Sequence, residues 1–123
     1  NCNMDIQILK VKDAGNIADE RIILKVERDC NINWYLLFDN TFDEVGNLSN
    51  LWRHLYIFPN LEVKAGDFIW LYTKCGTNSK RSNDSNTTTY LLYWGFQKTI
   101  WNSGGEHEVA HLVKYVDSQS KNV

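Results

Sequence analysis

Short runs of alternating side chains constrain the fold of this chain more than any other feature. β-Branched and aromatic residues recur at every second position, as at Ile22, Leu24 and Val26. A period of two is that of a β-strand, whose successive side chains point to opposite faces of a sheet. The same pattern starts at Ile6 and returns within residues 34–38, 56–58, 68–72, 90–94 and 109–116. These segments are therefore predicted to be strands.

Turn-forming residues separate these runs. Gly15, Gly46 and Gly66 each stand beside Asn or Asp, and Pro59 directly follows one run. Such residues favour tight turns, and a proline cannot donate a hydrogen bond within a sheet. The best helix candidate, residues 48–55, is short, and we expect it to be a loop with one turn. The pattern predicts an all-β fold, a sandwich or barrel of about seven short strands.

Two polar segments interrupt the strands without dividing the chain. Residues 39–54 are polar with a few apolar side chains, and residues 76–89 contain no large apolar side chain at all. We expect the second segment to be a solvated loop, because it has nothing to bury. With 123 residues and no linker composition, the chain is predicted to form one domain over residues 1–123.

The charge balance argues against a domain that binds nucleic acid over its whole surface. Thirteen Lys and Arg face fifteen Asp and Glu, which gives a net charge of -2. Binding driven by phosphates requires a basic field. The nearest local candidate is the set Lys74, Lys80 and Arg81, in and just before the second polar segment. We favour a solubilising loop over the alternative, a local basic patch.

Cysteine usage and hydropathy bear on the compartment. Cys2, Cys30 and Cys75 are three in number, so at least one thiol has no partner within the chain. No Cys-x-x-Cys motif is present, and disulfides are not expected to hold the fold. The odd count and the lack of a recognisable signal sequence favour the cytoplasm. No apolar run approaches the roughly 20 residues that span a bilayer, so no membrane insertion is expected.

One motif suggests an enzyme. His107-Glu108-Val109-Ala110-His111 matches H-E-x-x-H, which in zinc peptidases lies on a helix and brings both histidines to the metal. Here the motif follows two glycines and precedes the strand-like residues 112–116. On a strand, His107 and His111 would lie about 13 Å apart. That is too far to share one zinc ion at about 2.1 Å per bond. We therefore interpret both as strand histidines.

A complete metal site or catalytic site is not visible elsewhere in the sequence. After His111 only Asp117 offers an oxygen ligand, and nothing places the upstream His54 beside the motif. The sequence contains no G-x-S-x-G, P-loop or G-x-G-x-x-G motif. We predict a protein that is not an enzyme, with no catalytic, metal or cofactor-binding residues. A zinc hydrolase remains a minor alternative.

An acidic group lies in the first polar segment. Asp39, Asp43 and Glu44 could bind a cation, or they could form a solvated acidic loop. The Asp-x-Asp-x-Gly arrangement of a calcium loop is absent. We therefore favour the solvated loop.

Several short motifs, in order, resemble one family. The most specific are Leu92-Tyr93-Trp94-Gly95 and Ile100-Trp101-Asn102-Ser103-Gly104-Gly105-Glu106, preceded by Phe58-Pro59 and Ala65-Gly66-Asp67. Residues 20–25 and 34–36 fit the family's earlier strands more loosely. Together these motifs resemble the lamin tail domain, found in nuclear lamins and in many bacterial proteins. The resemblance covers about residues 4–117 and implies an immunoglobulin-like β-sandwich of about seven to nine short strands.

The residues that carry the resemblance suit an architectural role. Trp94 and Trp101 are large apolar side chains whose indole N–H can bond a carbonyl, which would pin two sheets together. Gly95 would end a strand, and Gly104 and Gly105 would permit a tight turn. An exposed tryptophan pair that stacks on sugars or bases is the alternative.

The resemblance implies a non-catalytic binding or tethering module. Lamin tail domains contact proteins and chromatin, and in bacteria they are often attached to hydrolases and surface proteins. We therefore expect a protein partner first. The alternatives are a nucleic-acid-binding module that uses Lys74, Lys80 and Arg81 with aromatic residues, and, less favoured, a carbohydrate-binding module. The sequence does not indicate an oligomeric state.

Overall fold

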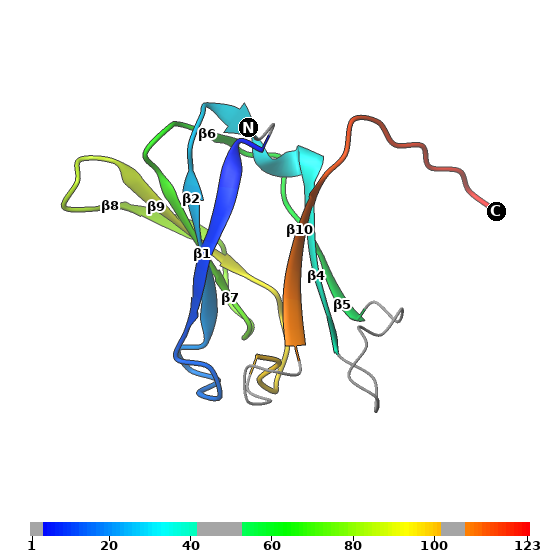
Figure 1. Cartoon of the computed structure of the whole chain (residues 1–123), viewed down its shortest axis with the longest axis horizontal. Coiled ribbons are helices and arrows are strands. Elements are labelled where there is room, and N and C mark those ends of the chain that lie inside the picture. The colour runs from blue at the N-terminus through cyan, green and yellow to red at the C-terminus, as the bar shows by residue number, and fades with distance from the viewer. Residues whose placement is uncertain (1–3, 42–52, 102–107) are drawn as a thin grey trace.

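Two β-sheets form the main layers of the structure (Figure 1). The computed structural model describes residues 4–41, 53–101 and 108–123. In chain order its elements are β1 (Ile6–Lys12), β2 (Arg21–Val26), β3 (Cys30–Asn31), the 3-10 helix η1 (Ile32–Trp34), β4 (Tyr35–Thr41), β5 (Arg53–Ile57), β6 (Glu62–Val63), β7 (Phe68–Tyr72), β8 (Ser79–Ser82), β9 (Thr88–Tyr93) and β10 (Glu108–Lys114).

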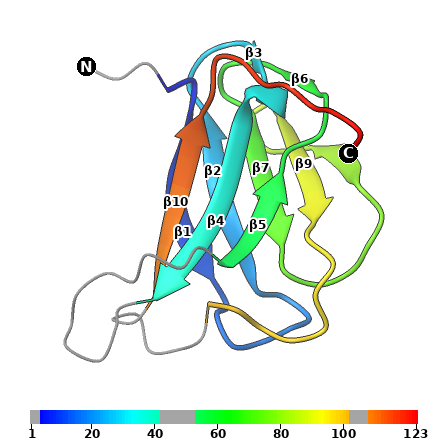
Figure 2. The same cartoon turned by 90° about the vertical axis from the view of Figure 1, so that its right-hand side faces the viewer.

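The sheets have simple strand orders. One sheet has five strands in the order β1-β2-β7-β9-β8, and the other has three in the order β10-β4-β5. A third, two-stranded sheet pairs β3 with β6. All pairs are antiparallel except β7 and β9, which run parallel (Figure 2). The predicted all-β sandwich is confirmed, and each of the seven alternating runs corresponds to a strand.

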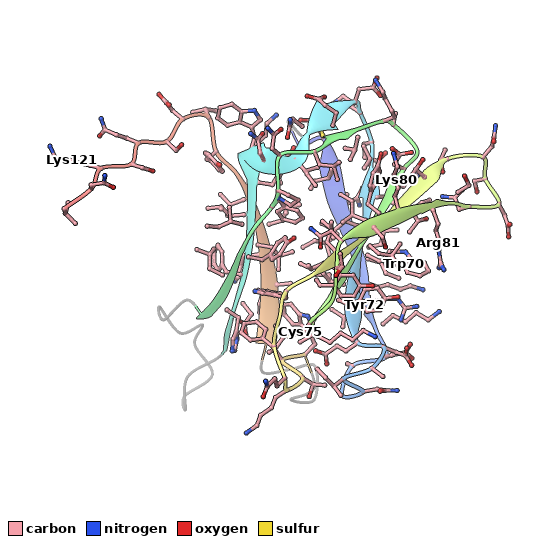
Figure 3. The ribbon with its side chains drawn as sticks, turned by 180° about the vertical axis from the view of Figure 1, so that it is seen from behind. Trp70, Tyr72, Cys75, Lys80, Arg81 and Lys121 are labelled. Atoms are coloured by element: carbon pink, nitrogen blue, oxygen red, sulfur yellow. The ribbon has the colours of Figure 1, made fainter. Side chains whose placement is uncertain are left out.

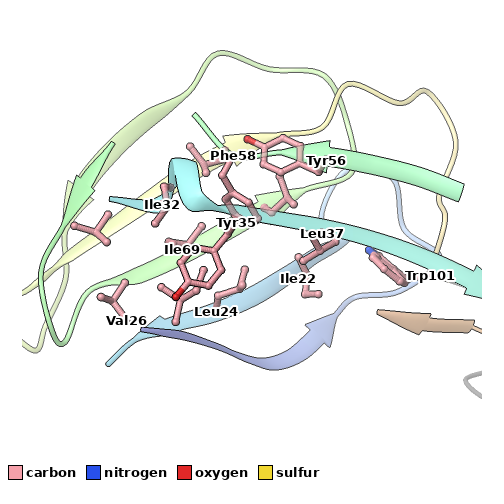
Figure 4. Packing of buried hydrophobic residues seen from close by; sticks show 14 of the residues in the cluster. Ile22, Leu24, Val26, Ile32, Tyr35, Leu37, Tyr56, Phe58, Ile69 and Trp101 are labelled. Atoms are coloured by element: carbon pink, nitrogen blue, oxygen red, sulfur yellow. The ribbon is translucent and has the colours of Figure 1, made fainter. Parts of the chain in front are cut away.

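The core lies between the five-stranded and three-stranded sheets (Figure 4). From the larger sheet, Leu24, Ile69 and Leu71 are completely buried, and they meet Tyr35 and Leu37 of β4. Alternation explains this placement, because every second residue of β7 and β4 faces inward. The intervening residues face outward, and the two sheets therefore present two outer faces.

Buried carboxylates fix the turns around this core. Glu20 is completely buried and accepts hydrogen bonds from Gly15 N, Thr73 Oγ1 and Ile100 N at 2.9, 2.6 and 2.9 Å. Asp67 accepts from the backbone N–H groups of Lys64 and Thr88. A buried carboxylate needs such donors to offset its desolvation. Both acids are therefore committed to the architecture.

The first and last strands are joined at one edge of the sandwich by Asp5. Its carboxylate accepts hydrogen bonds from Arg28 Nε, Lys114 Nζ and the Tyr35 hydroxyl, at 3.0, 3.0 and 3.1 Å. Burial raises the pKa of Asp5, but these hydrogen bonds outweigh it and lower the pKa below 3.8. Asp5 precedes β1, whereas Tyr35 begins β4 and Lys114 ends β10. The charged cluster thus links the two sheets.

The prediction of a continuous loop over residues 76–89 is wrong. Residues Ser79–Ser82 form β8, which pairs with β9 at the edge of the larger sheet. All four residues are exposed, so the segment is solvated as expected. Their strand conformation comes from hydrogen bonds to β9, which do not depend on an apolar pattern.

The prediction for residues 39–54 is also wrong where the structure describes them. Asp39–Thr41 belong to β4, and Arg53–Leu55, assigned to a loop with one turn, belong to β5. Residues 42–52 lie outside the described residues. The part of the chain that the structure describes contains no helix long and apolar enough to cross a membrane.

Candidate functional site

The H-E-x-x-H motif lies mainly on a strand. Glu108 and His111 belong to β10, as predicted, and His107 lies outside the described residues. The His111 ring stacks on Phe38 of the neighbouring strand, with centroids 4.9 Å apart. Among residues 4–41, 53–101 and 108–123, no three His, Cys, Asp or Glu side chains are grouped to hold a metal ion. The helical geometry on which a zinc peptidase depends is not present in β10.

A second histidine pairs with a buried acid. His54 Nδ1 lies 2.8 Å from Asp39 Oδ1, and Asp39 is completely buried. The expectation that Asp39 belongs to a solvated acidic loop is therefore wrong, while Asp43 and Glu44 lie outside the described residues. His54 has a φ of 49°, and its ring meets Phe96 edge-on at 5.0 Å. The pair connects β5 to β4.

Trp101 is part of the core, and Trp94 is partly buried against it. Trp101 is only 8% exposed, and Trp94 packs beside it with ring centroids 6.1 Å apart. The Trp94 indole N–H donates to the carbonyl oxygen of Leu55 at 3.3 Å, which connects the segment after β9 to β5. The Trp101 indole N–H has no hydrogen-bond partner within the described structure. Their burial favours the architectural interpretation over an exposed stacking pair.

The described glycines near these motifs lie at a strand end or in a turn, as predicted. Gly95 has a φ of 104° and follows β9, and Gly66 has a φ of 95° in the turn before β7. Both conformations are left-handed and favour glycine. Asn102, Gly104 and Gly105 lie outside the described residues.

The residues of the alternative basic patch, Lys74, Lys80 and Arg81, do not form one surface. Lys80 and Arg81 are neighbours on β8, so their side chains point to opposite faces of the sheet. Arg81 pairs with Thr89 and lies over the Trp70 ring, whereas Lys80 pairs with Tyr90, which packs against the core. Lys74 lies over the Tyr72 ring at 5.3 Å. Lys74 and Arg81 thus belong to the outer face of the five-stranded sheet, and Lys80 does not.

That outer face carries a wider set of cations. Strand register aligns Lys12, Arg21, Tyr72 and Tyr93 in one row across the sheet. The next row contains Lys10, Ile23, Trp70, Leu91 and Ser79, and the third contains Gln7, Lys25, Phe68, Thr89 and Arg81. None of these outward positions is acidic. We call the three rows, together with Lys74, the basic face.

Aromatic rings of the basic face are already in contact with cations. The guanidinium carbons of Arg21 and Arg81 lie 4.7 and 4.8 Å from the centroid of the Trp70 ring. The register places them in the rows on either side of Trp70. Tyr72 stacks on Tyr93 with centroids 5.2 Å apart and an interplanar angle of 15°. The aromatic rings therefore hold these cations in place through cation–π contacts.

The outer face of the three-stranded sheet has a different character. Its described outward positions are apolar apart from His111, and three of them are strongly exposed: Leu55, Ile57 and Val113, at 53, 64 and 38%. Ile57 and Val113 both pair with Leu36 and so lie in one row. We call Leu36, Leu55, Ile57 and Val113 the apolar face. Exposed apolar residues gathered in this way are typical of an interaction surface.

Sequence reasoning missed the basic face for one reason. It compared charges along the chain, where Lys10, Lys12, Arg21 and Lys25 look dispersed. The signal was present in their spacing, because residues two or four apart on a strand share a face.

Comparison of the chain with protein-family models and with curated proteins finds no match.

Proposed function

We propose that the chain is a non-catalytic binding module, similar to lamin tail domains, whose partner is a protein. The observation that carries the proposal is the apolar face, where Ile57 and Val113 are exposed on the two outer strands of one sheet, in one row with Leu36 between them. Burying such side chains contributes about 25 cal/mol per Å² of apolar area, which provides the driving force for association.

The hydrogen bonds of the buried and half-buried acids also support a binding role. Glu20 and Asp67 hold turns, Asp5 joins the sheets and Asp39 is paired with His54. These four acids stabilise separate parts of the fold and do not line one shared cavity. The similarity to lamin tail domains rests on the motifs quoted above, and the fold alone does not define a function.

Site-specific photo-cross-linking in cells of the source organism tests this proposal. In one variant of the chain a photoreactive amino acid replaces Val113. In a second variant it replaces Lys12 on the basic face. We expect one discrete protein adduct from position 113, which Ile57→Asp removes and Lys12→Gln retains. A second copy of the chain counts as a protein partner. No adduct, or an adduct unaffected by Ile57→Asp, would contradict the proposal.

A further inference from the structure

We propose that the basic face binds single-stranded nucleic acid through its phosphates, independently of any protein on the apolar face. The whole chain is acidic, with a net charge of -2, yet the outward positions of β1, β2, β7, β9 and β8 include no acid. The charges of the molecule are therefore segregated. A cationic surface on an acidic protein attracts polyanions locally and without a strong overall field.

The exposed cations of this face have no acidic partner within the described structure. Lys10, Lys12 and Arg81 are exposed, and Lys25 and Lys74 are half-buried. Arg21 differs, because its Nη1 contacts Asp13 Oδ2 at 3.1 Å and the Asp19 carbonyl at 2.7 Å. It is 9% exposed and acts as a fixed support. The five other cations are available to phosphates.

The aromatic residues of the face prepare its cations for binding. Trp70 lies between Arg21 and Arg81, and Tyr72 contacts Lys74. Such contacts restrict the rotamers of long side chains before a ligand arrives, which lowers the entropic cost of binding. The Tyr93 ring stacks on Tyr72 and also lies against Gly76, where any side chain would collide with the Tyr93 ring. The stack is therefore closely packed against the backbone.

The shape of the face favours a single strand over a duplex. Five strands at about 4.8 Å each make the face wider than the roughly 12 Å major groove of DNA, so it cannot enter that groove. A duplex with a persistence length of about 50 nm would touch the sheet along one ridge only. A flexible single strand can cross the sheet from one edge to the other. It can place some phosphates near Lys10 and Lys12 on β1 and later ones near Arg81 on β8, about 19 Å away at about 4.8 Å per strand.

Fluorescence anisotropy with a labelled oligothymidylate of about 20 nucleotides tests the proposal. The affinity should fall steeply with salt, because each phosphate contact on a single strand contributes about -0.7 to the slope of log K against log salt. We expect Arg81→Gln to weaken binding several-fold and to reduce that slope by about 0.7. Lys80→Gln is the matched control. It removes the same charge from the adjacent position on the opposite face, and should change affinity far less.

Two further probes and a second variant complete the test. A duplex of the same length and polyglutamate should each bind at least tenfold more weakly than the oligothymidylate. Lys10→Gln with Lys12→Gln should lower affinity more than Arg81→Gln alone, whereas Lys121→Gln, on the distant C-terminal segment, should have little effect (Figure 3). Equal effects of Lys80→Gln and Arg81→Gln, tighter binding of either competitor probe, or no binding at low salt would overturn the proposal. The apolar face is unaltered in every variant, so the cross-linking experiment remains a separate test.

Discussion

The two outer faces of the sandwich differ far more than the two inner faces. Inside, both sheets contribute the same kinds of side chain, such as Leu71 from β7 and Leu37 from β4, and both are completely buried. Outside, the larger sheet presents lysines and arginines over aromatic rings, whereas the smaller presents Ile57 and Val113. The inner faces must fit each other, but each outer face faces only solvent or a partner.

This contrast separates residues that stabilise the fold from residues that are available for function. A packed interior tolerates little change in volume. An outer position such as Lys12 can change with little effect on stability. Each sheet therefore carries its structural role on one side and its chemistry on the other. Substitutions at neighbouring positions along one strand should reveal this division.

The largest effect is expected from a change on the inner side of the smaller sheet. Leu37→Ala removes a completely buried side chain and leaves a cavity against the core, so it should lower the free energy of unfolding by about 2–5 kcal/mol. Ile57→Ala, on the outer side of the adjacent strand, should change it by about 0.5 kcal/mol or less. Urea denaturation followed by tryptophan fluorescence measures both. Similar losses in the two variants would mean that the apolar face is part of the core.

Strand identity was predictable because alternation is a local signal. Seven runs were recognised, since residues such as Ile22, Leu24 and Val26 show their inward side directly in the sequence. β8 was missed because Ser79–Ser82 has no apolar alternation and is strand only through pairing with β9. β3 and β6 have two residues each, too few to show a period.

The candidate surfaces were less predictable, because they depend on register between distant strands. Lys12 meets Arg21, and Arg21 meets Tyr72, only after β1, β2 and β7 have paired. Sequence reasoning therefore grouped Lys80 with Arg81, which are adjacent in the chain. It could not find the contact between Arg81 and Trp70, which bridges β8 and β7.

A smaller, pH-dependent effect is expected where the sheets join. Because the pKa of Asp5 is lowered in the folded protein, its carboxylate stabilises the fold above its ordinary pKa of 3.8. This contribution is lost as the pH falls through the folded-state pKa. Asp5→Asn should therefore be less stable than the unmodified chain near neutral pH and lose less stability on acidification. Urea midpoints at several values between about pH 6 and pH 2 measure this.

The comparison at Asp5 also has a control. Lys114→Gln removes one of its cationic hydrogen-bond donors and should weaken the acid dependence without abolishing it, because Arg28 and Tyr35 still donate. If Asp5→Asn and the unmodified chain lose stability in parallel, the acid-sensitive group lies elsewhere and Asp5 does not join the sheets electrostatically.

The last prediction concerns the reactivity of the cysteines, which provides a probe of the basic face. Cys75 is exposed and follows Lys74, whereas burial raises the pKa of Cys30 to about 11. Since the thiolate is the reactive form, iodoacetamide near pH 8 should modify Cys75 at least tenfold faster than Cys30. A Cys2→Ser background restricts the measurement to these two thiols, and peptide mass spectrometry distinguishes them.

A fluorophore on Cys75 then connects reactivity to the contrast between the faces. Cys75 lies at the end of the larger sheet close to Tyr72 (Figure 3). Its emission should change when oligothymidylate is added, and Arg81→Gln should reduce the response. Ile57→Asp should leave that response intact, because the apolar face lies on the other sheet. A response lost in Ile57→Asp but retained in Arg81→Gln would show that the two faces do not act independently, and the segregation of charge would then have no bearing on binding.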